Sequence, residues 1–416
     1  MTDTTKPKLR AVDVRPFHDG GRPLLLLRDP LRLSDLTVVM PQALAPLLAM
    51  LDGSREVDEL RAALLVRTGL DVPREVIHQL LEHLDNALML DNERYARSYQ
   101  QAVQCYRTAP AREMALAGEG YPAEPEALRR LLEGYLAAAS QDSTSTVASG
   151  TVVGLISPHI DYQRGGPTYA QVWQAAAAAA RAAELVVIFG TDHNGHRSLI
   201  TPTRQNYATP YGVLPTAREV VDAVAAAVGE EAAFCEEINH RGEHSIELAA
   251  VWLHHMRGGE PCALVPILCG SFHQFIADGR SPAEDPTLNT ALETLHTAIA
   301  GRRTLVVAAA DLAHVGPAFG DPFPVDYVRY LRLQAADEML LQTILRVDAE
   351  AFYQMVAREG NQRNICGVPP IYMTLRMLAE GSVGVLTGYE RCPADAQNTS
   401  FVSICGVVFH NVSMLG

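Results

Sequence analysis

Three apolar segments of this 416-residue sequence are each followed by a histidine or an aspartate. Each segment is a continuous run of aliphatic residues, which is typical of a strand buried on both faces of a parallel sheet. The segments and the side chains that follow them are 152–156 with His159, 185–190 with His193, and 305–310 with Asp311 and His314. Because open α/β sheets bind ligands at the carboxyl ends of their strands, we expect these side chains to meet at one edge.

Two further segments carry side chains that could join this group. His244 follows Glu243 where a helix is expected to begin, and Cys366 lies in a turn closed by Gly367, just before another expected helix. A helix N-terminus lowers the pKa of a thiol, which favours the thiolate that binds metals. A single histidine is more often a hydrogen-bonded structural residue, and we keep that interpretation for His254, His255, His273, His296 and His410.

Two histidines and one cysteine form a coherent set of metal ligands. With His159, His193 and Cys366 as ligands, Fe(II), Cu or Zn would keep positions open for water, substrate or dioxygen. Asp311 and His314 would then form a proton relay beside the metal, and a helical turn would place both on one face. Acid–base chemistry without a metal stays open for this pair.

Alternating strand-like and helix-like segments are expected to position these residues. From residue 151 onward the alternation predicts an α/β domain, with a mostly parallel sheet covered by helices on both faces. The expected strands are 152–156, 185–190, 263–268, 304–309, 383–389 and 400–409, and the expected helices are 217–228, 245–256, 286–300, 325–347, 349–358 and 370–379.

Residues 1–105 are predicted to form a separate, small α+β domain. We interpret residues 1–22 as a polar lead-in, followed by strands at 24–30 and 36–40, helices at 41–51, 57–68 and 74–88, and a closing strand at 89–91. This order is typical of a winged helix, and segments 51–53, 57–60 and 84–91 resemble small PqqD-like peptide-chaperone domains. Residues 74–91 contain four acidic side chains and one arginine, so this domain is not expected to bind DNA.

Residues 106–150 are predicted to be a junction between this domain and the α/β domain, residues 151–416. The junction holds a helix at 125–139 and a polar connector, rich in serine and threonine, at 140–150. Glycine and proline interrupt the chain before the helix, as is usual in a linking segment.

Composition and charge narrow the possible partners. The formal net charge of −14 disfavours a nucleic-acid partner, whose phosphates require a basic surface. We expect a cytoplasmic protein without a membrane anchor, because no secretory signal or bilayer-length apolar run is apparent. The cysteines are odd in number and lack a CxxC pair, which predicts reduced thiols at positions 105, 235, 262, 269, 366, 392 and 405.

About 300 residues, from Arg112 to the end, resemble the MEMO proteins, called protein B of the AmmeMemoRadiSam system in prokaryotes. The residues that carry the resemblance are Pro158-His159 with Tyr162, Gly190-Thr191-Asp192-His193, Thr209-Pro210-Tyr211-Gly212, Glu243-His244-Ser245-Ile246-Glu247, Asp311 with His314, Cys366-Gly367 and Asn398-Thr399-Ser400-Phe401-Val402-Ser403. The sequence departs from the family at Thr191-Asp192, where a Pro-Ser pair is usual, and around Tyr121, where a neighbouring aromatic residue is usual.

The resemblance implies a fold like that of the LigB-type class III extradiol dioxygenases, which hold non-haem iron with two histidines and a carboxylate. It implies metal ligands at His159, His193 and Cys366, with cysteine in place of the carboxylate. It also implies an acid–base role for His314, with Asp311 and His244 lining the pocket. A thiolate makes the site softer, so ring cleavage does not carry over to this chain.

These observations leave three hypotheses about function. The first is a non-haem iron or copper oxidoreductase, dioxygenase-like in fold, acting on a small molecule. The second is a non-catalytic scaffold that binds a peptide or partner, since the resemblance implies phosphopeptide binding and work with radical-SAM and AMMECR-type proteins. The third is a zinc-stabilised or metal-free fold with neither role.

Overall fold

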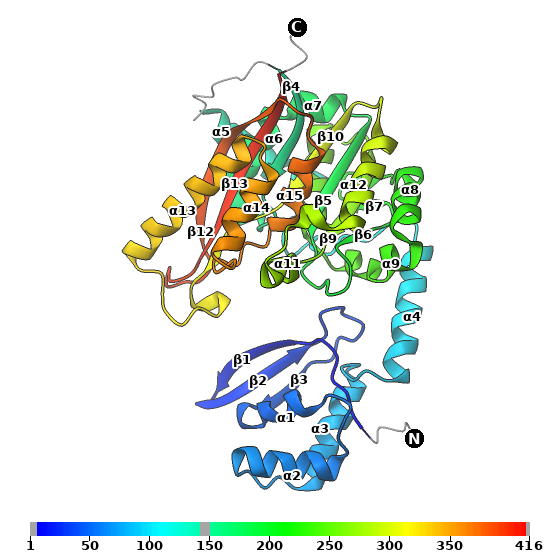
Figure 1. Cartoon of the computed structure of the whole chain (residues 1–416), viewed down its shortest axis with the longest axis vertical. Coiled ribbons are helices and arrows are strands. Elements are labelled where there is room, and N and C mark those ends of the chain that lie inside the picture. Colours follow the sequence, from blue (N-terminus) through cyan, green and yellow to red (C-terminus); the bar gives the residue numbers. More distant parts are fainter. Residues whose placement is uncertain (1–5, 142–149, 413–416) are drawn as a thin grey trace. The chain divides into compact units, whose positions relative to one another are not determined.

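The computed structural model describes residues 6–141 and 150–412, and the chain divides into two compact units (Figure 1). The first unit comprises Met1–Thr108 and the second Ala109–Gly416. The polar connector expected at 140–150 lies mostly outside the described residues. Within the described residues, no helix combines the length and apolar character that crossing a bilayer requires.

The first unit is a small three-stranded antiparallel sheet with helices. Its sheet runs in the order β1-β2-β3, and alternate residues of β2 and β3 pack into a core with the helices. The elements are β1 Asp13–Asp19, β2 Arg22–Arg28, β3 Val38–Pro41, α1 Ala45–Met50, α2 Val57–Thr68, α3 Arg74–Asn86 and α4 Glu93–Thr108. The helix α2 begins with a capping box, in which Glu56 and Glu59 each accept a hydrogen bond from the other's backbone N–H.

Two expectations for this unit are wrong. Residues 13–19 form a strand, β1, where we expected part of a polar lead-in, and Gly20 and Gly21 turn the chain into β2. This strand lies at the sheet edge and is largely exposed, so its sequence lacks the apolar alternation of a core strand. The expected closing strand at 89–91 is reduced to one isolated bridge, between Leu9 and Leu90.

The second unit is built on an eight-stranded sheet, and the predicted α/β class is confirmed. Along its main path the order is β11-β13-β4-β10-β5-β9-β6, with β12 paired to β13. The four central strands, β4, β10, β5 and β9, are parallel, and antiparallel strands flank them on both sides. The strands are β4 Thr151–Ser157, β5 Leu185–Thr191, β6 Ile200–Pro202, β9 Ala263–Cys269, β10 Thr304–Ala309, β11 His314–Val315, β12 Ser382–Pro393 and β13 Phe401–Asn411, and β7 Tyr207–Thr209 and β8 Gly212–Leu214 form a separate hairpin.

Helices cover both faces of this sheet (Figure 1). In β5, Val187 and Phe189 point into one core, whereas Val186 and Ile188 point into the other, which explains the continuous apolar run. The first core includes residues of α8 Arg218–Val228, α9 Glu230–Phe234, α11 His273–Asp278, α12 Pro286–Ile299, α13 Tyr327–Leu345, α14 Ala349–Arg358 and α15 Val368–Met377. The second includes residues of α5 Pro125–Gln141, α6 Tyr162–Ala175, α7 Ala177–Ala182 and α10 Ser245–Met256.

Candidate metal centre

The carboxyl ends of three adjacent parallel strands, β4, β10 and β5, deliver the polar residues predicted from the sequence. His159 follows β4, Asp311 and His314 follow β10, and His193 follows β5. The loop before α15 adds Cys366. The helical turn expected at 311–314 is wrong, because residues 310–313 form no regular secondary structure and His314 pairs with β13 as part of β11.

His159, His193 and Cys366 bring three possible ligand atoms together, all within 4.8 Å of one another. Nε2 of His159 lies 3.2 Å from Sγ of Cys366, and the two imidazole centroids are 5.1 Å apart. His159 is buried, whereas the His193 side chain is 35% exposed. The cluster therefore has one closed side and one side open to a ligand.

Both histidines have their other ring nitrogen engaged. Nδ1 of His159 donates to the backbone oxygen of Ala309 at 2.9 Å, and Nδ1 of His193 donates to the carboxylate of Glu243 at 3.0 Å. A proton held on Nδ1 leaves the Nε2 lone pair free, which is the usual arrangement of metal-binding histidines. The two nitrogens and the sulfur fit a tetrahedral Zn, Fe or Cu site with one open position.

The local charges favour a thiolate beside cationic imidazoles. Burial opposes ionisation of Cys366, but His159, His314 and His193 lower the pKa of the thiol well below its usual value. Burial would lower the pKa of His159, but Asp311 and Cys366 raise it to about 9. Burial would likewise lower the pKa of His193, but Glu243 and Cys366 raise it well above its usual value. A cation added to the centre would replace these protons as the partner of the thiolate.

A cavity of about 580 Å³ opens beside the cluster and gathers the remaining predicted residues. His159, His193, His244, Asp311 and His314 all line it. Asp311 is buried, and its Oδ1 accepts a hydrogen bond from the backbone N–H of His159 at 2.8 Å. Apolar side chains form another part of the wall: Leu116, Ile160, Leu248, Phe319 and Val402. We call this the large cavity.

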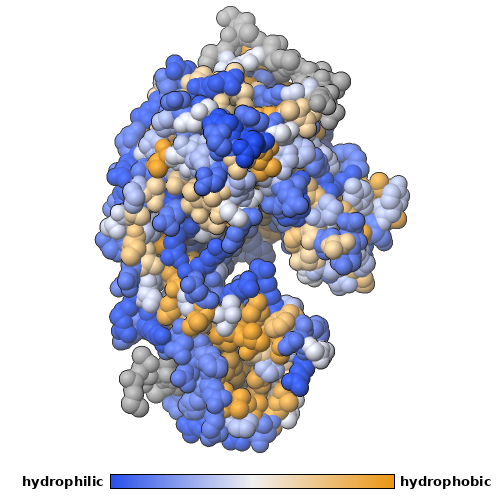
Figure 2. Space-filling view, turned by 180° about the vertical axis from the view of Figure 1, so that it is seen from behind, coloured by the Kyte–Doolittle hydropathy of each residue, from blue (hydrophilic) through white to orange (hydrophobic). Residues whose placement is uncertain are grey.

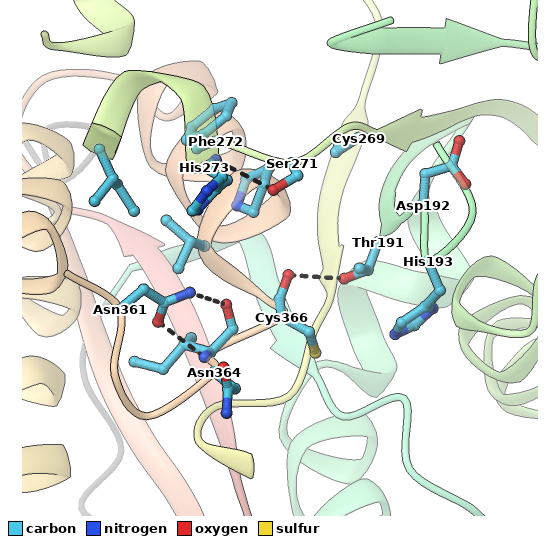
Figure 3. Close-up of a pocket in the computed structure, with 14 residues that line it drawn as sticks. Thr191, Asp192, His193, Cys269, Ser271, Phe272, His273, Asn361, Asn364 and Cys366 are labelled. Carbon is cyan, nitrogen blue, oxygen red and sulfur yellow. Dashed lines mark hydrogen bonds between the residues drawn. The ribbon is translucent and has the colours of Figure 1, made fainter. Parts of the chain in front are cut away.

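A second cavity, of about 270 Å³, borders the cluster on another side and is lined by other residues besides His193 (Figure 3). We call it the small cavity. His193 and Cys366 line it together with Thr191, whose hydroxyl donates to the backbone oxygen of Cys366 at 3.3 Å. Asn361 braces the same loop through the backbone of Ile365. His193 lines both cavities, so it lies where they approach one another.

Close backbone packing at Gly367 holds Cys366 in place. The backbone N–H of Gly367 donates to the backbone oxygen of Asp311 at 3.1 Å. A Cβ atom at Gly367 would lie 2.3 Å from that oxygen, so only glycine permits this approach. The contact fixes the loop of Cys366 against the end of β10, beside His159.

A buried network that the sequence analysis missed holds α10 against residues 112–121. The guanidinium of Arg112 forms an ion pair with Glu247 and donates to the backbone oxygens of His240 and Glu243, at 2.7 and 2.6 Å. The hydroxyl of Tyr121 donates to Glu247 at 2.5 Å. The network therefore fixes the start of α10, where His244 lies. The sequence offered one signal, two glutamates four residues apart around His244.

The loop after β5 is braced by the segment before α10. Glu236 accepts hydrogen bonds from the backbone N–H groups of residues 196–198, and Asn239 donates to Asp192. His196 is exposed and lines neither described cavity. His193 is therefore the histidine of this loop that faces the centre.

The fold and the site place this chain in a class of α/β proteins with a candidate metal centre, in which histidines at adjacent strand ends lie beside a thiol. Comparison with known proteins identifies the family. Residues 112–408 match the family model described as Memo-like protein, and the chain belongs to that family. The resemblance expected from about Arg112 onward is thereby confirmed.

Similarity to individual relatives extends over different lengths of the chain. A MEMO1 family protein of Aquifex aeolicus is 24% identical over 417 residues, which covers 97% of this chain and 100% of the relative. A MEMO1 family protein of Archaeoglobus fulgidus is 26% identical over 295 residues, 71% of this chain and 97% of the relative. The Aquifex alignment thus includes the first unit, which lies outside the family match.

Proposed function

We propose that this protein is a metal-dependent redox protein, a non-haem iron or copper oxidoreductase with a dioxygenase-like fold. His159, His193 and Cys366 are its metal ligands in this proposal. The observation that supports it best is the pairing of each histidine Nδ1 with an oxygen acceptor, which leaves both Nε2 atoms available beside Sγ of Cys366. The bound metal would supply a redox-active or Lewis-acid centre at the wall of the large cavity.

The surrounding residues have separate tasks in this proposal. Nδ1 of His314 lies 3.2 Å from the backbone oxygen of Leu312, so its Nε2 is free to exchange a proton with a ligand in the large cavity. The ring of Phe319 packs edge-to-face on His314 and holds its orientation. Asp311 holds the backbone of His159 in place, and His244 lines the cavity as a second imidazole.

The ligand set favours Fe(II), with Cu or Zn as alternatives. One thiolate with two imidazoles is softer than the set with a carboxylate, which favours redox chemistry at iron or copper. Zinc would fit the same donors and would make the centre structural or hydrolytic.

Metal content after anaerobic purification tests this proposal. We expect about one iron or copper ion per chain, and loss of most of it in Cys366→Ser, because the serine hydroxyl does not supply a thiolate. Cys235→Ser is the matched control, since Cys235 lines neither described cavity. Full occupancy in Cys366→Ser would contradict the ligand set. Zinc alone, with no oxygen uptake by iron- or copper-loaded protein given a reductant, would contradict the redox assignment.

A second candidate function is a scaffold for a peptide or partner, and the surface of the first unit favours it. Figure 2 shows hydrophobic side chains gathered on this unit, at the bottom of the view. Leu36, Val39 and Val66 are 55%, 51% and 88% exposed. A PqqD-like unit of this kind would present a peptide to a radical-SAM protein, with an AMMECR-type protein as a further partner. Binding of the full chain to a radical-SAM protein, lost in Val39→Glu, is the expected result.

A further inference from the structure

Glu243 lies between two imidazoles of the large cavity. Its carboxylate is buried, and it contacts Nδ1 of His193 at 3.0 Å and Nδ1 of His244 at 3.1 Å. The two rings stack with centroids 4.9 Å apart and planes at 13°. One carboxylate therefore contacts the same ring position of both histidines.

Backbone donors fix the orientation of this carboxylate. Oε1 accepts from the backbone N–H groups of His244 and Ser245, at 2.8 and 3.0 Å. Oε2 accepts from the backbone N–H of His193 at 3.1 Å. With both oxygens held by backbone groups, the carboxylate can neither rotate nor withdraw without leaving buried donors unsatisfied.

We propose that Glu243 is a positioning residue that fixes the tautomer and orientation of His193 and His244 together. It holds a proton on Nδ1 of each ring, so each Nε2 points away from the carboxylate. Nε2 of His193 then serves as a metal ligand, and Nε2 of His244 becomes a hydrogen-bond acceptor in the large cavity. The metal-ligand part rests on the proposed function, whereas the placement of the protons does not.

The same three residues could be considered a second metal site, because their ligand atoms also lie within 4.8 Å of one another. The hydrogen bonds argue against it, since each oxygen of Glu243 already accepts from a backbone N–H. A cation there would compete with those donors for the same lone pairs. The geometry is therefore better explained by positioning.

Nuclear magnetic resonance of metal-free, ¹⁵N-histidine-labelled protein tests the proposal on the unsubstituted chain. We expect hydrogen-bonded Nδ1–H protons on both His193 and His244, whether each ring is neutral or cationic. An Nδ1 without its proton on either ring would overturn the proposal. This measurement needs no bound metal, so it separates the proposal from the proposed function, which the metal content after anaerobic purification tests independently.

Glu243→Gln makes the test sharper, because the two ends of the amide differ. Two backbone donors face Oε1 and one faces Oε2, so the amide oxygen should replace Oε1 and the NH₂ group should face His193. Nδ1 of His193 would keep only its 3.1 Å contact with the oxygen at the Oε1 position, so we expect its Nδ1–H signal to shift toward that of a weaker hydrogen bond, whereas the signal of His244 changes little. The dissociation constant for zinc should increase about 10- to 100-fold, the usual effect of losing such a partner.

Glu236→Gln is the matched control. Glu236 also accepts backbone hydrogen bonds in the loop after β5, but those described for it come from backbone N–H groups and none from an imidazole. Both Nδ1–H signals and the zinc affinity should stay close to those of the unsubstituted protein. An equal loss of zinc affinity in both variants would mean that Glu243 only stabilises the loop, as Glu236 does, and would overturn the proposal. Two zinc ions per chain, reduced to one by Glu243→Gln, would favour the second metal site instead.

Discussion

Cys366 of the metal-free protein is expected to react with iodoacetamide at pH 6.5 about 10-fold faster than an ordinary cysteine, because its larger thiolate fraction outweighs the lower nucleophilicity of a thiolate with a low pKa. A thiol with a pKa near 8.5 is only about 1% thiolate at that pH, and the thiolate is the nucleophile. His159, His314 and His193 lower the pKa of Cys366, so its thiolate persists. The small cavity gives the reagent access. Mass spectrometry of the alkylated peptides measures the rate at each cysteine.

The alkylation rates of Cys366 and Cys235 should differ in how steeply they depend on pH. Burial and Glu236 raise the pKa of Cys235, so its rate should fall steeply as the pH drops from 9 to 6, whereas that of Cys366 should change little. Zinc should protect Cys366 alone. A Cys366 rate that falls in parallel with that of Cys235 would show that the histidines do not stabilise the thiolate.

The same shifts set a pH window for stability. The lowered pKa of Cys366 stabilises the fold fully above the ordinary thiol pKa, and this contribution is lost as the pH falls through the lowered value. The raised pKa of His159 has the opposite pH dependence. Its contribution to stability is fully present below the ordinary pKa of 6.5 and is lost as the pH rises through about 9. Cys366 and His159 together therefore stabilise the metal-free fold most between pH 6.5, the ordinary pKa of histidine, and pH 9.0, the ordinary pKa of the thiol.

Arg112→Met should lower the free energy of unfolding by about 3–5 kcal/mol, the usual cost of breaking a buried ion pair from one side. Arg112 and Glu247 are 0% and 1% exposed, so the carboxylate left behind has no access to water. The backbone oxygens of His240 and Glu243 also lose a charged donor. Chemical denaturation followed by circular dichroism measures the change.

Arg302→Met is the control for this prediction. Arg302 pairs with Glu219 at 2.9 Å, and both side chains are exposed, so the expected cost is below about 1 kcal/mol. Equal stabilities of the two variants would mean that the Arg112 network contributes little to the fold.

The strand ends that form the centre could be predicted because each strand is recognisable from its own short stretch of sequence. The strands before His159 and His193 are buried on both faces, and such strands appear as continuous apolar runs. The backbone conformation of the residues that follow a strand is harder to predict from sequence. Asp311 and His314 line the same cavity as expected, but an irregular segment and the pairing of β11 with β13 bring them there instead of a helical turn.

Partners that meet only in the folded chain could not be predicted. Glu243 contacts His193 from 50 residues away, and Arg112 contacts Glu247 from 135 residues away. No periodicity in the sequence encodes these separations, because they depend on which strands are neighbours in the sheet. The edge strand β1 was missed for a related reason, since its exposed residues carry little apolar pattern.

X-ray absorption spectroscopy of the zinc-loaded protein tests the central claim, a His/His/Cys centre, most directly. The structure predicts one sulfur at about 2.3 Å and nitrogen or oxygen ligands at about 2.0–2.1 Å, with histidine scattering at longer range. In Cys366→Ser, the zinc that still binds at a saturating zinc concentration should show no sulfur contribution but should keep the histidine scattering. A shell of nitrogen and oxygen alone in the unsubstituted protein would contradict the claim.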